Sequence, residues 1–382
     1  STSRRQRQMC IRDSLFFFSK LAIMFLLYPI ITMLVSALVT VISMPLLLRF
    51  CQERGLFDMP NERKVHHNKI PRLGGVLFAP AAVIGIGVSI IVMMALKDNW
   101  LPSMAEPALF LFFGMFLIYI IGLLDDILGL DAKIKFGTQL VASFFMPFCH
   151  LYINNLYGFC GIYEISTWVG YPLTILLSLL IINAFNLIDG IDGLASGLGV
   201  IALGVYSYLF ASLGSVVFTV FAMGLFGTMM AFMYFNLFGN AEKFTKTFMG
   251  DTGSLILGYS ITYLSIKYSM YNPQVFPVQS CPILVAYTLV LVPVLDLIRV
   301  AIERVSIGKG MFTPDKRHIH HLCMAAGMSM HKALAFILSL QFAFDLLNLA
   351  LFKYLSVPTT LIVLLNVAVY VLVVILLKKR NV

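Results

Sequence analysis

Charged residues are scarce in this 382-residue sequence, because Asp, Glu, Lys and Arg together make up only 12% of it. A soluble domain has roughly 25%, so a water-soluble globular protein is excluded. The 27 glycines and 15 prolines are too few for a fibrous or proline-rich chain. The six cysteines include no C-x-x-C pair and no metal-ligand spacing. We interpret them as small apolar packing residues, with a Cys149–Cys160 disulfide as the alternative.

Apolar residues are abundant instead, at 60% of the chain, and the mean hydropathy is +0.91. A membrane-spanning helix needs about 20 apolar residues. Eleven apolar runs are candidates: 21–48, 74–96, 105–123, 134–153, 167–187, 194–212, 215–237, 253–268, 282–302, 332–352 and 357–377. We therefore expect residues 1–382 to form a single all-α, polytopic membrane domain with about 10–11 transmembrane helices.

The positive charges are distributed unevenly over the expected loops. If the loop at 49–73 is cytoplasmic, 19 Lys and Arg residues lie on that side and 3 on the other, which fits the positive-inside rule. The basic N-terminal tail, residues 1–20, conflicts with this rule because an odd number of spans places it outside. The stretch 14–48 is about 53 Å long as a helix. We favour one tilted span with an extended or interfacial start, and a re-entrant pair is the alternative.

The acidic residues lie where a transporter would not place them. Ionisable residues of transporters tend to lie at mid-membrane depth, along a path through the bilayer. Here six acids lie at span ends or in loops, all on the face that carries the 19 cations: Asp125, Asp126, Asp189, Asp192, Asp251 and Asp315. This distribution predicts chemistry at one membrane surface, with a water-soluble substrate from the cytoplasm and a lipid from the bilayer.

The pair Asp125 and Asp126 ends the third apolar run, beside Leu and Ile residues. Two adjacent carboxylates repel each other, and apolar surroundings increase the repulsion unless a cation or a shared proton relieves it. We therefore favour a divalent-metal site or a proton acceptor. A helix end that simply meets water is the alternative.

A second polar segment ends the fifth run, with two amides and two carboxylates within ten residues: Asn183, Asn186, Asp189 and Asp192. Because a glycine follows each Asp, both acids are candidates for turn formers. The preceding apolar run favours an ordered polar cluster at the membrane face, which suits hydrogen bonds to a nucleoside or a phosphate.

The eighth run opens with F-M-G-D-T-G-S, residues 248–254. Asp251 fits a helix N-cap. A helix start with small residues also offers free backbone N–H groups to a phosphate. An Asp in that place is also suited to holding Mg²⁺ between phosphates, because Mg²⁺ prefers one or two carboxylates together with phosphate oxygens.

A histidine-rich loop, expected at the cytoplasmic face over residues 303–331, contains Arg317, His318, His320 and His321. We favour a grip on a diphosphate by the Arg and His donors. A zinc site is an alternative, although the loop lacks cysteine partners and H-E-x-x-H spacing. A solvated polar loop is another.

A basic loop precedes the second run and contains His66 and Lys69 before P-R-L-G-G. Alone it is typical of a positive-inside anchor. Beside the other clusters, we expect it to supply further phosphate contacts.

Together these segments resemble the polyprenyl-phosphate N-acetylhexosamine-1-phosphate transferases, the MraY/WecA superfamily. Four blocks match in order: the basic loop ending in P-R-L-G-G, the Asp-Asp pair, N-L-x-D-G-x-D-G and F-M-G-D-x-G-S. A fifth block, H-I-H-H, is similar to the WecA/TagO-like branch. The resemblance covers about residues 50–330, and the long basic N-terminus departs from it.

The resemblance implies transfer of an N-acetylhexosamine 1-phosphate, foremost GlcNAc 1-phosphate, from a UDP-sugar to undecaprenyl phosphate with release of UMP. It implies Mg²⁺, with Mn²⁺ as a substitute, held by Asp251. It implies catalytic roles for Asp125 and Asp126 beside the lipid phosphate and for three histidines near the diphosphate or sugar: His318, His320 and His321. The expected substrate-binding residues are Lys69, Asn183, Asn186, Asp189, Asp192, Phe248, Arg317 and His66, with Phe248 stacking near uracil.

The chemistry of phosphoryl transfer agrees with these roles, because there a protein mainly positions reactants and neutralises charge. A phosphomonoester has a second pKa of about 6, so the lipid phosphate is largely dianionic at pH 7 and a single displacement is expected. A covalent aspartyl phosphate is the mechanistic alternative. An enzyme of this kind initiates a cell-surface polysaccharide from the bacterial inner membrane, with its active site in the cytoplasm.

The sequence also bears on other partners and on an alternative function. Membrane lipids are expected partners and nucleic acid is not, while a homodimer is compatible with the sequence but not decided by it. A transporter or flippase for an anionic nucleotide-sugar or lipid is the alternative function. Its nearest sequence feature is the pair Asp296 and Arg299 within the ninth run.

Overall fold

The structure is a computed structural model that describes residues 2–58, 69–96, 106–310 and 315–380, with only the backbone at 2–25, 58 and 106–108. The first half of the chain contains these elements: α1 (Thr2–Arg54), β1 (Phe57–Asp58), β2 (Ile70–Pro71), the 3₁₀ turn η1 (Gly74–Leu77), α2 (Phe78–Ala95), α3 (Glu106–Leu128), α4 (Ala132–Phe148), β3 (Asn155–Phe159), β4 (Ile162–Glu164) and α5 (Thr167–Ile188). The second half contains α6 (Leu194–Ser212), α7 (Val216–Phe238), α8 (Gly250–Ser269), α9 (Pro282–Leu289), α10 (Leu291–Ser306), α11 (Ile319–Ala325), α12 (Met330–Lys353) and α13 (Thr359–Lys379).

The fold is an all-α bundle, as the sequence predicts, and two short antiparallel hairpins are the sheets of the described part. Every one of the eleven apolar runs forms a helix or, for 282–302, the bent pair α9 and α10. Eight described helices are long and apolar enough to cross a membrane, and the bent pair makes up to nine. The other two runs form α4, which has 17 residues, and α8.

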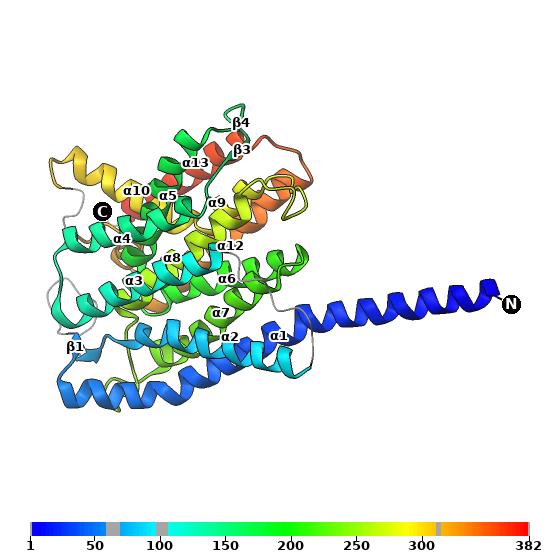
Figure 1. The fold of residues 1–382 in the computed structure, drawn as a ribbon. Coiled ribbons are helices and arrows are strands. Elements are labelled where there is room, and N and C mark those ends of the chain that lie inside the picture. The colour runs from blue at the N-terminus through cyan, green and yellow to red at the C-terminus, as the bar shows by residue number, and fades with distance from the viewer. Residues whose placement is uncertain (1, 59–68, 97–105, 311–314, 381–382) are drawn as a thin grey trace.

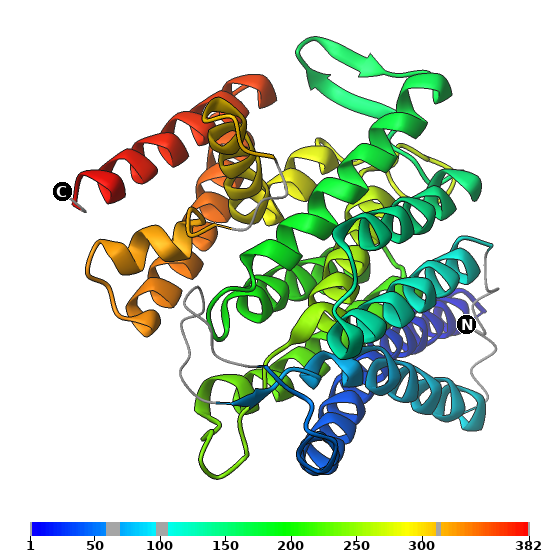
Figure 2. The same ribbon diagram turned by 90° about the vertical axis from the view of Figure 1, so that its left-hand side faces the viewer.

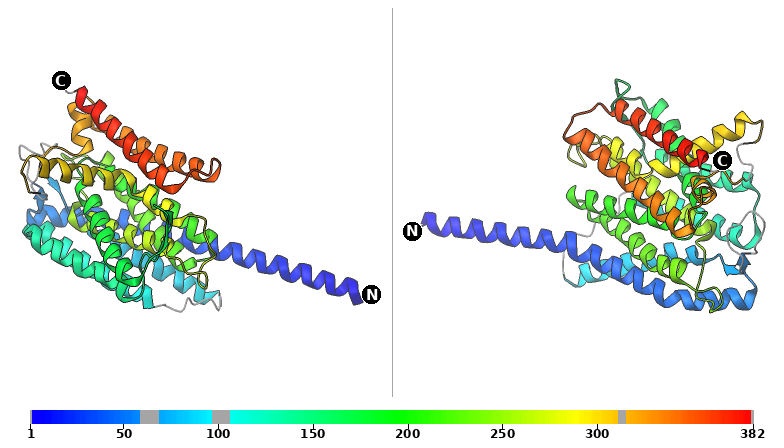
Figure 3. Two further views of the ribbon diagram at one scale, coloured as in Figure 1. Left: turned by 90° about the horizontal axis from the view of Figure 1, so that it is seen from above. Right: turned by 180° about the vertical axis from the view of Figure 1, so that it is seen from behind.

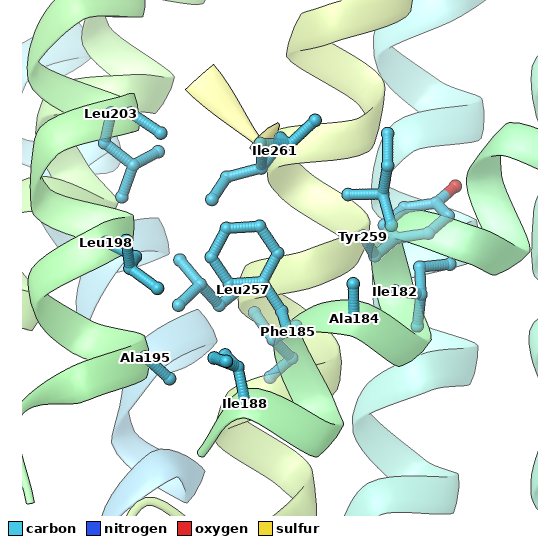
Figure 4. Packing of buried hydrophobic residues seen from close by; sticks show 14 of the residues in the cluster. Ile182, Ala184, Phe185, Ile188, Ala195, Leu198, Leu203, Leu257, Tyr259 and Ile261 are labelled. Atoms are coloured by element: carbon cyan, nitrogen blue, oxygen red, sulfur yellow. The ribbon is translucent and has the colours of Figure 1, made fainter. Parts of the chain in front are cut away.

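Helix α8 lies inside the bundle rather than at its surface. It packs against α3, α5, α6 and α9, and nearly all of its side chains are buried. Figure 4 shows the packing around it, where Phe185 from α5 lies among Leu257 of α8 and Leu198 of α6. A helix covered by protein on all sides needs little apolar surface toward lipid, which explains why α8 is rich in Ser, Thr and Gly.

Helix α1 is one continuous helix of 53 residues, although it contains Pro29 and Pro45. Its apolar part, Leu26–Arg54, is the candidate span, and it packs against α2 and α7. The earlier part of α1 projects beyond the bundle (Figure 1). The re-entrant pair that the sequence left as an alternative is therefore wrong, and so is an extended start, because residues 2–20 continue the helix.

The connections divide the bundle into two ends. The hairpin of β3 and β4 connects the end of α4 to the start of α5 at one end and projects from the helices (Figure 2). At the other end α3, α5, α7 and α10 finish and α4, α6 and α8 begin. Each of the acid-containing segments lies at these helix ends. The cysteines whose side chains are described are all free, and Cys149 is buried while Cys160 is exposed.

The bend of 67° between α9 and α10 breaks the helical hydrogen-bond ladder inside the bundle. The Gln341 side chain of α12 fills the break, because its Nε2 donates to the Thr288 carbonyl and its Oε1 accepts from the Val292 N–H. Thr288 and Val292 are four residues apart, so the Gln341 amide replaces the bond that an unbroken helix would make. Helices α12 and α13 lie side by side on this flank (Figure 3).

We expect Gln341→Leu to lower the free energy of unfolding by roughly 1–3 kcal/mol, because it leaves two buried backbone groups without partners. Thermal unfolding of the purified protein in detergent measures this loss. Phe342→Leu is the matched control, since Phe342 is the exposed neighbour on the same helix and its replacement should leave the transition unchanged. An equally stable Gln341→Leu variant would show that the side chain does not support the bend.

Candidate active site

The first turn of α8 is held by a carboxylate from a different helix. Asp126, near the end of α3, accepts hydrogen bonds from the Asp251 N–H at 2.8 Å, the Thr252 N–H at 2.9 Å and the Thr252 hydroxyl at 2.6 Å. The N-terminal N–H groups of a helix have no acceptors within the helix. Here the Asp126 carboxylate is the acceptor for two of them. Its own exposure is 5%.

The helix boundary and this contact correct two sequence-based interpretations of the F-M-G-D segment. Met249 occupies the N-cap position and Asp251 lies in the first turn, so Asp251 is not an N-cap. The N–H groups of Asp251 and Thr252 bind Asp126, so they are not free for a phosphate. Gly250 has a φ of +71°, and a Cβ there would collide with the Arg72 carbonyl and the Asp126 carboxylate. The close approach therefore requires glycine.

Asp125 and Asp251 meet around one ammonium group. Lys135 Nζ, from α4, lies 2.8 Å from Asp125 Oδ2 and 3.2 Å from Asp251 Oδ2. The other oxygen of Asp125 accepts from the Leu130 N–H at 2.7 Å. Asp125 is buried, whereas the side chain of Asp251 is 31% exposed, so Asp251 is the carboxylate of this pair that solvent reaches. The sequence interpretation counted Lys135 among the positive charges but gave it no role, and its spacing of ten residues from Asp125 carries no motif.

The polar segment after α5 contributes to the same cluster. Asn186 Nδ2 donates to Asp251 Oδ1 and to Ser254 Oγ. Asp189 follows α5 directly, and burial together with the charges of Asp192 and Asp251 raises its pKa to about 8. Asn183 lies elsewhere: its amide donates to Gln139 Oε1 of α4 at 2.6 Å and so connects two helices.

Asp192 is buried and paired rather than open to solvent. Lys246 Nζ lies 2.6 Å from its Oδ2. Asn236, at the end of α7, accepts from the Gly193 N–H and donates to the Thr247 carbonyl, and its amide lies 3.4 Å from Asp192. The contacts of Lys246 and Asn236 with Asp192 were not predicted from the sequence, because neither residue belongs to a charged cluster there.

The histidine loop reaches the turn that follows α5. A Cβ at Gly190 would collide with the imidazole of His320, so the absence of a side chain at Gly190 permits the contact. His320 is buried, and burial followed by the charges of His321 and His318 lowers its pKa to about 3. Its ring is therefore neutral near pH 7. The rings of His318 and His320 are stacked with their centroids 5.9 Å apart, while the His321 ring lies 4.2 Å from that of His320 and is tilted by 46° against it.

Asp315 and Arg317 belong to the ion pairs that shape this loop. Arg304 Nη2, in α10, lies 3.0 Å from Asp315 Oδ1. Although burial raises the pKa of Asp315, its contact with Arg304 lowers that pKa below its ordinary value. Arg317 is 3.3 Å from Asp315 and half-buried, so it remains accessible to an anion.

The remaining predicted residues lie at the edge of this cluster or outside the described part. Lys69 is exposed just before β2, and the Phe248 N–H donates to the Pro71 carbonyl of that strand. His66 lies outside the described residues. The cluster formed by Asp125, Asp126, Lys135, Asn186, Asp189, Asp192 and Asp251 is called the acid cluster below.

The acid cluster suits a cation that arrives with a substrate. Among the described residues, no three His, Cys, Asp or Glu side chains form a ready metal cage. The zinc alternative for the histidine loop therefore gains no support. Mg²⁺ needs fewer protein ligands, since one or two carboxylates suffice when phosphate oxygens and water complete its shell. Asp251 and Asp125 already surround a position occupied by one positive group, the Lys135 ammonium.

Comparison with known proteins gives consistent relatives. Residues 108–269 match the glycosyl transferase family 4. The chain is 32% identical, over 83% of both chains, to a probable undecaprenyl-phosphate N-acetylglucosaminyl 1-phosphate transferase of Bacillus subtilis (strain 168). It is 34% identical to a decaprenyl-phosphate N-acetylglucosaminephosphotransferase of Mycolicibacterium smegmatis, over 74% of this chain and 72% of the relative. It is 29% identical to an undecaprenyl-phosphate alpha-N-acetylglucosaminyl 1-phosphate transferase of Escherichia coli (strain K12), over 74% and 73%.

The raised pKa of Asp189 predicts how stability changes with pH. The folded protein binds a proton at Asp189 up to about pH 8, whereas the unfolded chain releases it near pH 4. The unfolding free energy should therefore fall as pH rises, by at most about 1 kcal/mol between pH 7 and pH 8, and level off above. In Mg²⁺-free detergent, the unfolding temperature measured over this window should fall in the wild type and less in Asp189→Asn.

His320 does not disturb this measurement, because its lowered pKa makes it neutral above pH 7 in both the folded and the unfolded chain. Asp131→Asn is the control, since Asp131 caps α4 at an exposed position and should keep the wild-type slope. Equal slopes for the wild type and Asp189→Asn would contradict a raised pKa at Asp189.

Proposed function

Because this chain belongs to the MraY/WecA superfamily of polyprenyl-phosphate N-acetylhexosamine-1-phosphate transferases, we propose that it transfers GlcNAc 1-phosphate from UDP-GlcNAc to undecaprenyl phosphate. The products are the lipid-linked diphosphate sugar and UMP. The observation that carries the proposal is the convergence of residues from α3, α4 and α5 at the start of α8. We propose that the two phosphate-bearing substrates meet beside these acids, this lysine and this amide.

The acid cluster supports a division of roles among its members. Asp251 is the more accessible carboxylate and is the residue that we propose holds Mg²⁺, with Asp125 beside it. When bound, Mg²⁺ neutralises phosphate charge and orients the diphosphate. Asp126 binds the first turn of α8 and so fixes where Asp251 lies. Lys135 provides a positive charge for a phosphate oxygen, and Asn186 orients Asp251 through a hydrogen bond.

The nucleotide and sugar are proposed to lie between the turn after α5 and the histidine loop. Asp189 and Asn186 offer hydrogen-bonding groups there, while Phe248 precedes α8 at the same surface. Arg317, His318, His320 and His321 supply donors for the diphosphate. The excess of Lys and Arg in the loops that the sequence assigns to one side, 19 against 3, supports a cytoplasmic site in a bacterial inner membrane. A transporter is not favoured, because the relatives are transferases and the acid cluster lies at helix ends rather than at mid-membrane depth.

The assay that tests the function combines purified protein, UDP-GlcNAc, undecaprenyl phosphate and Mg²⁺, with UMP as the product measured. We expect UMP release that needs all three additions, and a panel of UDP-sugars should rank UDP-GlcNAc first. Asp251→Asn should lower the rate at least about 100-fold, because the proposed metal ligand loses its charge. Asp131→Asn, an exposed acid near the same end, should keep the wild-type rate. Undiminished turnover in Asp251→Asn would remove Asp251 from the metal role.

The reaction is proposed to be a single displacement in which the lipid phosphate oxygen attacks the β-phosphorus of UDP-GlcNAc and UMP leaves. The dianionic lipid phosphate needs no deprotonation at pH 7, so Asp125 is not required as a base and serves mainly to hold Lys135 and to support the proposed Mg²⁺ beside Asp251. Labelled UMP should therefore not exchange into UDP-GlcNAc when the lipid is absent. Exchange without lipid, lost in Asp125→Asn, would instead indicate a covalent aspartyl phosphate.

A further inference from the structure

Asp296 is a buried acid that none of the roles above uses. It lies in α10 with no exposed surface, and its hydrogen bonds within the described residues go to groups outside the acid cluster. Four donors surround its carboxylate. His318 Nδ1 lies 2.7 Å from Oδ2, while the Ile319 N–H at 3.0 Å, Arg299 Nη2 at 2.6 Å and the Tyr370 hydroxyl at 3.0 Å all reach Oδ1. The carboxylate can only accept, so each of these groups must present a proton to it.

These contacts attach the histidine loop to α10 and, through Tyr370, connect it to α13. Asp296 binds the side chain of His318 and the backbone of Ile319, the first residue of α11. Arg299, one turn further along α10, donates to Asp296 and also to the Arg317 carbonyl. Tyr370 connects the same carboxylate to α13. Three consecutive loop residues are thereby fixed against α10, and each contact is buried or half-buried.

The contact with Asp296 decides which nitrogen of His318 carries a proton. Because the carboxylate accepts from Nδ1, that nitrogen bears hydrogen, and Nε2 is the nitrogen directed away from Asp296. The His318 ring lies parallel to the His320 ring, with an interplanar angle of 3°. His320 in turn contacts the backbone at Gly190, between the two acids that follow α5. The chain of contacts from Asp296 therefore ends at the proposed nucleotide-binding turn.

We propose that Asp296 is a positioning residue for the transfer reaction, which holds the Nδ1 proton of His318 so that Nε2 faces the diphosphate of the nucleotide-sugar. This inference rests on the proposed function. Asp296 touches no substrate in this scheme and acts through His318. An aligned imidazole stabilises charge that develops on the departing phosphate, so its loss should lower turnover more than substrate affinity.

The kinetic test uses the wild type and Asp296→Asn in the UMP-release assay. We expect kcat to fall at least about 30-fold, while KM for UDP-GlcNAc and for undecaprenyl phosphate stays within about threefold. Asp345→Asn is the matched control, because Asp345 is another acid within the helices and its hydrogen bond in the described part of the chain is to Gln341 of its own helix rather than to the histidine loop. It should keep the wild-type kcat. A near-normal kcat in Asp296→Asn, or a loss confined to KM, overturns the proposal.

A double-mutant cycle separates this role from a purely structural one. In a His318→Gln background, adding Asp296→Asn should lower the residual kcat less than about threefold, because the group through which Asp296 acts is already gone. A further loss as large as in the wild type would show that Asp296 acts by supporting the fold and would overturn the inference. If the wild type releases no UMP, the proposed function fails, which is a different outcome from a wild type that is active and insensitive at Asp296.

The proton on His318 can also be observed without turnover. Nitrogen NMR of the full chain labelled with ¹⁵N-histidine resolves protonated from unprotonated ring nitrogens, and His318→Gln assigns the His318 signals by their disappearance. We expect a protonated Nδ1 in the wild type. A ring with hydrogen on Nε2 alone overturns the proposal, even if Asp296→Asn does not fold.

Discussion

The position of the site depends on the hydrogen bonds between Asp126 and the first turn of α8. A helix start buried inside a membrane bundle would leave N–H groups without water or partners, which is costly in this environment. Asp126 supplies both of its oxygens to that turn and to the Thr252 hydroxyl. The contact fixes α3 against α8, and it sets where Asp251 and Asp125 lie relative to one another. Asp125 and Asp251 are therefore positioned by a third carboxylate, that of Asp126, which has a structural task.

The carboxylates of the acid cluster repel one another, and neighbouring groups have to reduce this repulsion. Several carboxylates lie near one another in surroundings with little solvent, where like charges interact strongly. Lys135 is shared by Asp125 and Asp251, and Lys246 pairs with Asp192. Asp189 has no such cation in the described contacts, and its pKa is raised to about 8. The cluster thus combines ion pairs with a retained proton, and a divalent cation with its phosphate ligands would add to the same balance.

Much of the fold could be predicted from the sequence, because apolar runs separated by charged residues indicate membrane helices directly. All eleven runs appear as helices, and the acid-containing segments meet at one end, as the distribution of charge predicts. The family resemblance is confirmed by relatives that cover most of the chain. The roles of single residues were less accessible. Asp125 and Asp126 are adjacent in sequence, yet one binds Lys135 and the other binds a helix start, because neighbouring helical residues point about 100° apart.

Other features depend on contacts that no local pattern reports. Lys135 and Lys246 are unremarkable in sequence, and each gains its role from a partner on another element. Asn183 resembles Asn186 in its motif but bonds Gln139 of α4 instead of the acid cluster. The pair Asp296 and Arg299 looks like a simple contact one turn apart, whereas the structure adds His318 and Tyr370 to it.

The bend between α9 and α10 connects the membrane bundle to the histidine loop. A straight helix over residues 282–306 would have kept its backbone bonds, but it would have directed α10 elsewhere. At the bend, α10 turns by 67°, and it then carries Asp296, Arg299 and Arg304, which bind the loop. The backbone groups freed by the bend need partners in an environment without water, and Gln341 provides them. A single amide in α12 thereby permits the geometry through which a membrane-embedded helix positions residues at the surface, which explains why a polar side chain is buried where an apolar one would pack more readily.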